Sequence, residues 1–183
     1  MLDVSGSGYD PYGKFSRNGS AIQPFPQLIT LLSAGVLASD AHLSRDGDNG
    51  QWHIKGDPTE GALVVAAAKA NLHRAELDSQ FPRVNEIPFT SETKRMTTLH
   101  ESPHGIVAYS KGAPEVILNS CAGQLTERGQ ASLDTSERET ILLFARQMAS
   151  EALRVIAVAQ KPDATLENAE KEIGTLLGLL KAV

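Results

Sequence analysis

The chain contains little of what covalent or metal cross-links require. Of its 183 residues only Cys121 is a cysteine, so no disulfide can form within the chain and no two-cysteine metal motif is possible. The five histidines are scattered, with no pair at metal-ligand spacing on one helix, and no Ser/His/Asp or Cys/His arrangement stands out. We therefore expect no catalytic residue and no metal site within the chain, and a reducing, intracellular setting.

Long apolar stretches and strongly basic stretches are also lacking. The best candidate for a membrane span, Leu28 to Ala38, is interrupted by Thr30 and Ser33 and falls short of the roughly 20 apolar residues that a span needs. The N-terminus lacks the basic-then-apolar order of a signal peptide. A net charge of −5 disfavours nucleic acid as a partner, because phosphate backbones attract basic surfaces. We expect a soluble body without direct membrane contact.

Helix starts are marked by capping residues and prolines. The prolines at the start of the segment Pro24 to Val36 precede apolar residues that fall on one helical face. Asp57 can cap the next helix, Pro58 takes its first position, and Glu60 stands where it would complete a capping box. This helix continues as a buried apolar segment over 61–71. Two more helical segments are predicted: a short one over 114–121 and a long amphipathic one from a capping box at Ser136 to Glu139.

Strand patterns are short and are separated by turn residues. They are predicted over 2–4, 14–16, 52–55, 84–89, 95–100, 105–111, 154–160 and 176–180. The run Pro103-His104-Gly105 could connect two of these strands as a hairpin. Because regular βα alternation is absent, we expect one domain over 1–183 with an α+β fold, in which helices flank a largely antiparallel, twisted β-sheet.

Lys111 is the sharpest functional candidate. It ends the apolar stretch Ile106 to Tyr109, Gly112 follows it, and Pro114 stands where a helix could begin. This order predicts a lysine at the rim of a sheet, where its cation can face a ligand. A solvated charge at a strand end is the ordinary alternative, since most lysines are exposed.

Other candidate residues also have ordinary interpretations. Phe89 could be a core residue or a platform on which a purine base stacks. Glu60 could simply complement a helix dipole, and Lys94 and Arg95 could be the charges of a hairpin turn. Arg154 could be a surface charge at the start of a strand. No one of these residues indicates a function by itself.

Their joint order is similar to that of a known family. The blocks that carry the likeness are Gly6-Ser7-Gly8-Tyr9-Asp10-Pro11 with Gly13, Gly56 to Leu63, Ile87 to Met96, Lys111-Gly112-Ala113-Pro114-Glu115, Leu153 to Ala159, and Gly174 to Leu180. Together they cover nearly the whole chain and resemble the nucleotide-binding domain of P-type, cation-transporting ATPases of the calcium- and sodium-pump type.

The resemblance implies a site for ATP. Phe89 would stack on adenine, Glu60 would contact the adenine edge, and Arg154 would hold the phosphate tail or the ribose. Lys94 and Lys111 would line the base pocket or approach the phosphates. The implied ATP-binding residues are Glu60, Phe89, Ser91, Lys94, Met96, Lys111, Gly112 and Arg154.

Ser91 is a departure from one branch of the family. Calcium pumps of the endoplasmic-reticulum kind resemble this block but carry arginine there, whereas sodium-pump-like relatives carry serine. The phosphate-side contacts are the ones that this difference affects.

The family's phosphorylated aspartate lies in an Asp-Lys-Thr-Gly-Thr motif, which this chain lacks. The resemblance therefore implies a nucleotide-binding domain excised from a larger pump, a cytoplasmic part of an integral membrane protein. It would be monomeric alone and would bind ATP without turning it over. Its partners would be the phosphorylation and actuator domains, and Mg²⁺ would arrive with ATP and be held mainly by the phosphorylation domain.

The transported ion would be calcium, from the overall likeness to bacterial calcium-pump sequences. Two alternatives remain open from the residues alone. One is a stand-alone nucleotide-sensing or partner-binding module, and the other is a complete soluble phosphotransferase that uses Lys111 and an acid.

Overall fold

The structure is a computed structural model and describes residues 1–47, 50–150, 154–170 and 174–182. Its helices are α1 (Pro26–Leu37), α2 (Pro58–Ala68), α3 (Arg74–Gln80), α4 (Pro114–Asn119) and α5 (Thr135–Ala149). Its strands are β1 (Asp3–Val4), β2 (Phe15–Arg17), β3 (Ser20–Ile22), β4 (His42–Arg45), β5 (Trp52–Lys55), β6 (Arg83–Ile87), β7 (Arg95–Ser102), β8 (Gly105–Gly112), β9 (Cys121–Thr126), β10 (Gly129–Ser132), β11 (Arg154–Pro162) and β12 (Gly174–Ala182).

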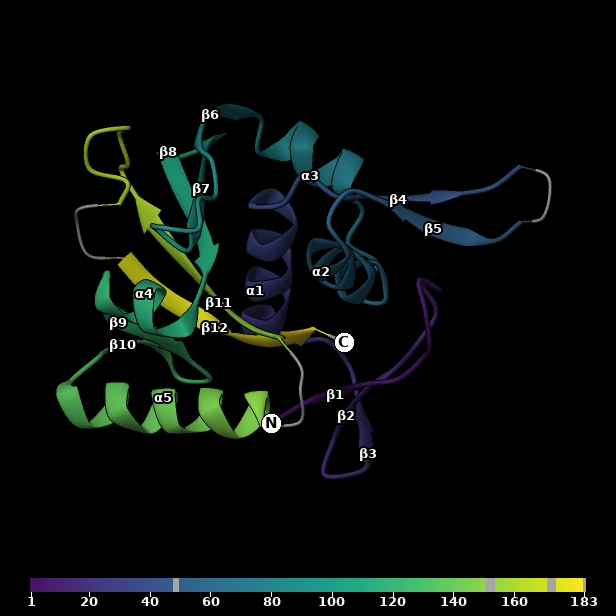
Figure 1. Cartoon of the computed structure of the whole chain (residues 1–183), viewed down its shortest axis with the longest axis horizontal. Coiled ribbons are helices and arrows are strands. Elements are labelled where there is room, and N and C mark those ends of the chain that lie inside the picture. Colours follow the sequence, from purple (N-terminus) through teal and green to yellow (C-terminus); the bar gives the residue numbers. More distant parts are fainter. Residues whose placement is uncertain (48–49, 151–153, 171–173, 183) are drawn as a thin grey trace.

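A seven-stranded sheet forms the centre of the fold, with the strand order β10-β9-β12-β11-β8-β7-β6. Every neighbouring pair is antiparallel except β12 and β9, which run parallel. Two small sheets, β1-β2-β3 and β4-β5, lie outside it, and the β4–β5 ribbon extends away from the body (Figure 1). The α+β class with a largely antiparallel sheet is therefore confirmed.

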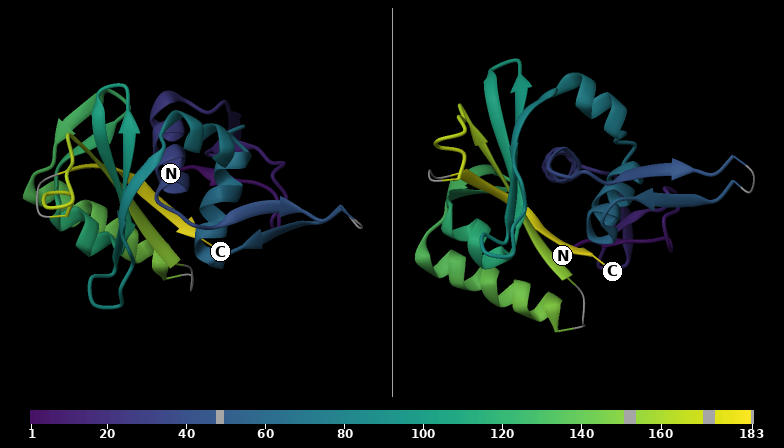
Figure 2. Two further views of the ribbon diagram at one scale, coloured as in Figure 1. Left: turned by 90° about the horizontal axis from the view of Figure 1, so that it is seen from above. Right: turned by 45° about the horizontal axis from the view of Figure 1, so that its top comes forward.

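The central sheet is covered on both faces, as the right-hand view of Figure 2 shows. Side chains alternate between faces along a strand, and this alternation divides the buried residues of the sheet between two clusters, one on each face. On one face, Val107, Tyr109 and Val158 pack in the cluster that contains the apolar side of α1. On the other face, Ala157 and Ala159 pack with residues of α4 and with the partly buried side of α5.

Local signals placed most helix starts correctly, but the capping box of α5 lies two residues earlier than predicted. Asp134 is the N-cap: its carboxylate accepts from the Glu137 N–H at 2.8 Å, and the Glu137 carboxylate accepts from the Asp134 N–H at 3.0 Å. Ser136, expected to be the cap, already lies within the first turn. Aspartate caps as well as serine does, and its charge also interacts favourably with the helix dipole.

Several elements have no clear signal in the sequence. β3, β4, α3, β9 and β10 were not predicted. The helix expected over 114–121 ends at Asn119, so that the buried Cys121 begins β9 instead. These strands form because a neighbour supplies the hydrogen bonds: β4 pairs with β5, and β9 pairs with β10 and β12. Leu153, at the start of one sequence block, lies outside the described residues.

A histidine is fully buried where β7 passes the end of α3. His100 is 0% exposed, its Nδ1 lies 2.8 Å from the Phe81 carbonyl oxygen, and its Nε2 lies 2.9 Å from Thr98 Oγ1. Because a carbonyl only accepts, Nδ1 carries the proton and Nε2 accepts from the threonine hydroxyl. Burial lowers the pKa of His100, which favours the neutral ring in the folded state.

We expect the fold to lose stability as the pH falls below about 6.5. There the unfolded chain protonates His100 while the folded chain does not, so the unfolded state binds more protons. When the pH falls from about 7.5 to 5.5, the free energy of unfolding should decrease by on the order of 1 kcal/mol more in the native protein than in a His100→Gln variant. Urea denaturation at both pH values measures this difference. His104→Gln, on the exposed β7–β8 turn, is the control that should keep the native pH dependence. Equal losses in native protein and His100→Gln would contradict the prediction.

Candidate functional site

The strands that carry most of the predicted site residues, β6, β7, β8 and β11, are neighbours in the central sheet (Figure 1), and their register brings those residues to one end of it. In the strand register Arg95 and Ala157 both pair with Gly112, so the start of β7, the end of β8 and the beginning of β11 lie side by side. The end of β6 is there too, because Ile87 pairs with Thr97. The C-terminal end of α1 and the first turn of α2 meet this end of the sheet through side-chain contacts.

Lys111 is buried at this end, with 7% of its surface exposed. Its Nζ donates to the Ala38 carbonyl oxygen, to Glu60 Oε1 at 2.6 Å and to Met96 Sδ at 3.2 Å. These three acceptors match the three N–H donors of an ammonium group. Burial lowers the pKa of Lys111, and the Glu60 carboxylate opposes that shift by stabilising the charged form.

The expectation that Lys111 presents its cation at the rim of the sheet is therefore wrong. Lys111 alternates with Val107 and Tyr109 on the face that α1 covers, so its side chain points inward. There it meets the carbonyl groups that the end of the helix leaves unpaired.

Glu60 connects α2 to the turn that follows α1. Its Oε2 accepts from the backbone N–H groups of Asp40 at 2.8 Å and Ala41 at 2.9 Å, while Oε1 accepts from Lys111. The capping box expected at the start of α2 is thus only half formed. Asp57 does accept from the Thr59 and Glu60 N–H groups, at 2.8 and 3.2 Å, but the Glu60 side chain turns toward the site instead of back to the cap.

Three cations from other elements converge on the C-terminal end of α1, whose last turn contains no basic residue of its own. Arg74 donates to the carbonyl groups of Val36 and Ser39, at 2.8 and 2.6 Å. Arg83 donates to those of Leu37 and Ser39, at 3.0 and 2.8 Å, and Lys111 donates to that of Ala38. Cations stabilise this negative end of a helix dipole. Sequence reasoning missed both arginines, because nothing near them in the chain indicates a helix end far away.

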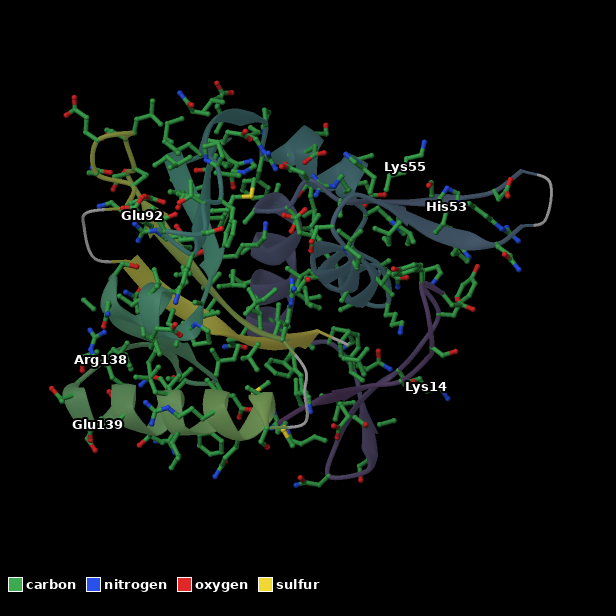
Figure 3. The ribbon with its side chains drawn as sticks, in the orientation of Figure 1. Lys14, His53, Lys55, Glu92, Arg138 and Glu139 are labelled. Carbon is green, nitrogen blue, oxygen red and sulfur yellow. The ribbon has the colours of Figure 1, made fainter. Side chains whose placement is uncertain are left out.

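The turn between β6 and β7 presents the exposed part of the site. Its backbone is fixed by a hydrogen bond from the Lys94 N–H to the Thr90 carbonyl oxygen at 2.8 Å, and Lys94 adopts a left-handed conformation with φ 51°. Phe89 is 58% exposed, which contradicts its ordinary interpretation as a core residue. Ser91 and Lys94 are exposed as well. Glu92, labelled in Figure 3, marks this turn.

Gly112 is where the β6–β7 turn contacts the end of β8. A Cβ atom at this position would lie 2.3 Å from the Lys94 carbonyl oxygen and 2.9 Å from Arg95 Cα. The same carbonyl oxygen accepts from the Ala113 N–H at 3.0 Å. Only glycine allows this close approach of two backbones.

Arg154 lies beside the N-terminal end of α2. Its Nη1 donates to Thr59 Oγ1 at 3.1 Å, and its side chain is exposed. Burial alone would raise the pKa of Asp57, but hydrogen bonds from Thr59 and Glu60 together with the nearby Arg154 cation outweigh it and lower that pKa. The structure thus brings Glu60, Met96 and Lys111 into direct contact, with Arg154 at the neighbouring residue Thr59.

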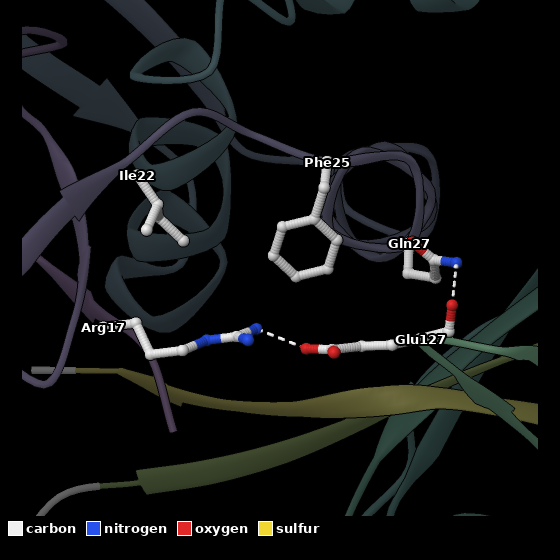
Figure 4. A pocket seen from close by; sticks show the side chains of 5 residues that line it. All are labelled: Arg17, Ile22, Phe25, Gln27 and Glu127. Carbon is white, nitrogen blue, oxygen red and sulfur yellow. Dashed lines mark hydrogen bonds and ion pairs between the residues drawn. The ribbon is translucent and has the colours of Figure 1, made fainter.

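A hollow of about 300 Å³ lies elsewhere and contains none of the predicted site residues. Arg17, Ile22, Phe25, Gln27 and Glu127 line it, and an ion pair joins Arg17 to Glu127 (Figure 4). Phe25 and Gln27 belong to the N-terminal end of α1, about 18 Å along the helix from the end that contacts Lys111. We therefore place the candidate site at the open end of the sheet and not in this hollow.

Two kinds of feature are absent from the residues that the structure describes. In 1–47, 50–150, 154–170 and 174–182, no three His, Cys, Asp or Glu side chains come together in a way that could hold a metal ion. Within the same ranges no helix combines the length and apolar character needed to cross a membrane.

Comparison with known proteins matches residues 27–176 to the family described as "P-type ATPase, cytoplasmic domain N". The cation-transporting ATPase pma1 of Synechocystis is 40% identical over 87% of this chain and 18% of its own length. A calcium-transporting ATPase of Bacillus subtilis is 34% identical over 96% of the chain and 20% of its own length. The calcium-transporting ATPase type 2C member 1 of cattle is 30% identical over 88% of this chain and 17% of its own length.

The chain spans about a fifth of the length of the curated relatives it matches. The family match covers most of the chain, and it includes α1 from Gln27 onward, the turn from β6 to β7, and the Glu60–Lys111 pair. The chain therefore belongs to the family of the cytoplasmic N domains of P-type ATPases.

Proposed function

We propose that this chain binds ATP as the nucleotide-binding domain of a cation-transporting P-type ATPase. It would hold adenine so that the γ-phosphate reaches the phosphorylatable aspartate of a neighbouring domain. The observation that carries the proposal is the exposed ring of Phe89 at the same sheet end as the Glu60–Lys111 pair and the exposed cations Lys94 and Arg154.

Hydrogen-bonding capacity suggests how the adenine contacts are divided. An ionised carboxylate offers about four acceptor sites, and Glu60 uses three of them on Asp40, Ala41 and Lys111. The remaining site can accept from the exocyclic amino group of adenine while the base stacks on Phe89. Lys111 has no donor left, so its role is to hold the Glu60 carboxylate in place.

The phosphate contacts then belong to exposed cations. Lys94 lies on the β6–β7 turn and Arg154 at the start of β11, and both have exposed side chains. Arginine offers a planar fork of donors that suits phosphate oxygens, and lysine adds a point charge. Ser91, on the same turn as Lys94, would add a hydroxyl where other family members carry arginine. Met96 would support the site indirectly, through its contact with the ammonium group of Lys111.

Phosphoryl transfer itself would take place outside this chain. The parent pump would supply the aspartate from its phosphorylation domain, and Mg²⁺ would come with the ATP phosphates. A hinge motion would carry the projecting γ-phosphate to that aspartate, with the actuator domain as a further partner. On this proposal the purified chain binds ATP and does not hydrolyse it, and sustained turnover by the pure chain would overturn it. Calcium as the transported ion follows the names of the Bacillus and cattle relatives and is a proposal too.

Phe89→Ala should weaken ATP binding by about 1–3 kcal/mol, because stacking on the ring is lost. The affinity can be measured by titration calorimetry on the purified chain, with folding checked by circular dichroism. Phe144→Ala is a matched control: Phe144 is also 58% exposed but lies on α5, away from the site, so its loss should leave the ATP affinity unchanged. A folded Phe89→Ala variant with native affinity would refute the stacking role.

A further inference from the structure

The side chains of β7 alternate between the site and the opposite face of the sheet. Met96 points toward Lys111 on the face that α1 covers, so Arg95 and Thr97 point to the other face. Residues 163–170, which follow β11, lie against that other face, where Ala164 and Ala169 are buried with Leu99 and Ala108.

Glu170 lies at the end of this segment and contacts β7 directly. Its Oε1 is 3.0 Å from Arg95 Nε and 2.9 Å from Thr97 Oγ1, and its backbone carbonyl oxygen lies 3.4 Å from Arg95 Nη1. The pair is shielded from water, since the side chains of Arg95 and Glu170 are only 14% and 17% exposed. Ion pairs shielded in this way hold their geometry, because separating them leaves a charge without compensation.

The direction of every hydrogen bond in this cluster can be assigned. A carboxylate only accepts, so the Thr97 hydroxyl donates to Glu170. Having used its one proton, Thr97 Oγ1 accepts from the Ser110 hydroxyl, which lies 2.8 Å away on β8. Glu170 is therefore the final acceptor in a series of hydrogen bonds that begins at Ser110 on β8, and it also forms an ion pair with Arg95. Arg95 Nε is paired with Glu170 by charge but makes no hydrogen bond of good geometry, so the ion pair and the hydroxyl series together hold the start of β7.

The residue before Arg95 is the strained lysine of the site. Lys94 has a φ of 51°, a conformation that non-glycine residues adopt only when their surroundings enforce it. On one side the Lys94 carbonyl oxygen is held by the Ala113 N–H and lies against Gly112. On the other side the chain continues at once into Arg95, whose side chain Glu170 holds.

We propose that Glu170 is a positioning residue for ATP binding: through Arg95 it fixes the start of β7 and so orients the turn that presents Lys94 to the phosphates. This inference rests on the proposed function. It adds a residue from the opposite face of the sheet that does not itself touch the nucleotide.

The test measures ATP affinity of the purified chain for Glu170→Gln, Lys94→Asn and the double variant. Glutamine keeps the shape of Glu170 and removes its charge, and asparagine tolerates the left-handed conformation at position 94 while removing the cation. Glu167→Gln is the matched control, because it removes a negative charge from the same segment at an exposed position. Should Glu170→Gln fail to fold, Arg95→Lys takes its place, since it keeps the charge and removes the planar guanidinium.

We expect Glu170→Gln to weaken ATP binding about threefold to tenfold and Glu167→Gln to leave it unchanged. When Lys94 is already asparagine, Glu170→Gln should cause little further loss of ATP affinity, because both substitutions act through the lysine at position 94. Backbone amide resonances of Lys94 and Gly112 should shift in Glu170→Gln without nucleotide.

Three outcomes would overturn the inference: native affinity in folded Glu170→Gln, an equal loss in Glu167→Gln, or losses that simply add in the double variant. In each of these cases Lys94→Asn alone would still weaken ATP binding, so the proposed function would stand. If neither Lys94→Asn nor Phe89→Ala weakens binding, the proposed function itself fails.

Discussion

Replacing Lys111 with alanine should lower the free energy of unfolding by about 3–5 kcal/mol, the loss typical when one partner of a buried ion pair is removed. The Lys111 and Glu60 side chains are only 8% and 15% exposed, and their charged atoms are 2.6 Å apart. Removing the ammonium leaves the Glu60 charge shielded from water and also deprives the end of α1 of a donor at Ala38. Two elements that meet at the site would thus lose their connection.

Urea denaturation measures this loss, with Lys55→Ala as the control. Lys55 is exposed on β5, and its removal should change stability by less than about 0.5 kcal/mol. Combining Lys111→Met with Glu60→Gln removes both charges and should restore part of the loss. If Lys111→Ala unfolds at the native urea concentration, the ion pair has no structural role.

The same variants separate positioning from phosphate contact. Because all three donors of Lys111 are used within the protein, Lys111→Met should weaken the binding of adenosine and of ATP by the same factor. A markedly larger loss for ATP than for adenosine would show that Lys111 reaches the phosphates, contrary to our assignment.

Gly112→Ala should destabilise the fold by about 3 kcal/mol and weaken ATP binding together. The added methyl group would lie 2.3 Å from the Lys94 carbonyl oxygen, which is backbone and cannot move aside without moving the turn. Since that turn presents Phe89 and Lys94, its displacement should affect the nucleotide site as well as stability. Thermal denaturation and ATP titration on one preparation test both effects.

Gly35→Ala provides the matched control for an added methyl group in the core. Gly35 lies within α1, and a Cβ there would come no closer than 3.7 Å to its nearest neighbour, Leu180 Cδ1. Alanine is favoured over glycine in a helix by about 1 kcal/mol, so this variant should be as stable as the native chain or more stable. A Gly112→Ala variant that behaves like Gly35→Ala would show that the turn accommodates the methyl group.

Features that depend on neighbouring residues were predictable from the sequence. Asp57 caps α2, prolines begin α1 and α4, and Pro103-His104 connects β7 to β8, all as local rules indicate. The start of α5 was misplaced because Asp134 and Ser136 are each followed, three residues later, by a glutamate. Local rules permit both boxes, and the helix uses the earlier one.

Features that depend on distant partners were not predictable. The burial of Lys111 follows from the position of Ala38, which is 73 residues away in the chain, and from the diversion of Glu60 away from its own cap. The roles of Arg83 and Glu170 likewise require the sheet order and the path of the connection after β11. A linear sequence shows which residues could carry charge and hydrogen bonds, but not which backbone ends will lack partners.

Because the side chains of β7 alternate between the two faces of the sheet, nucleotide recognition would depend on correct strand pairing. A slip of β7 by a single residue against β8 would turn Met96 away from Lys111 and turn Arg95 and Thr97 away from Glu170 at the same time. Misregistered or partly folded chains would therefore lose both halves of the arrangement together. Ligand affinity in this domain would then serve as a sensitive reporter of folding fidelity, detecting errors of one residue that leave the overall content of helix and strand unchanged.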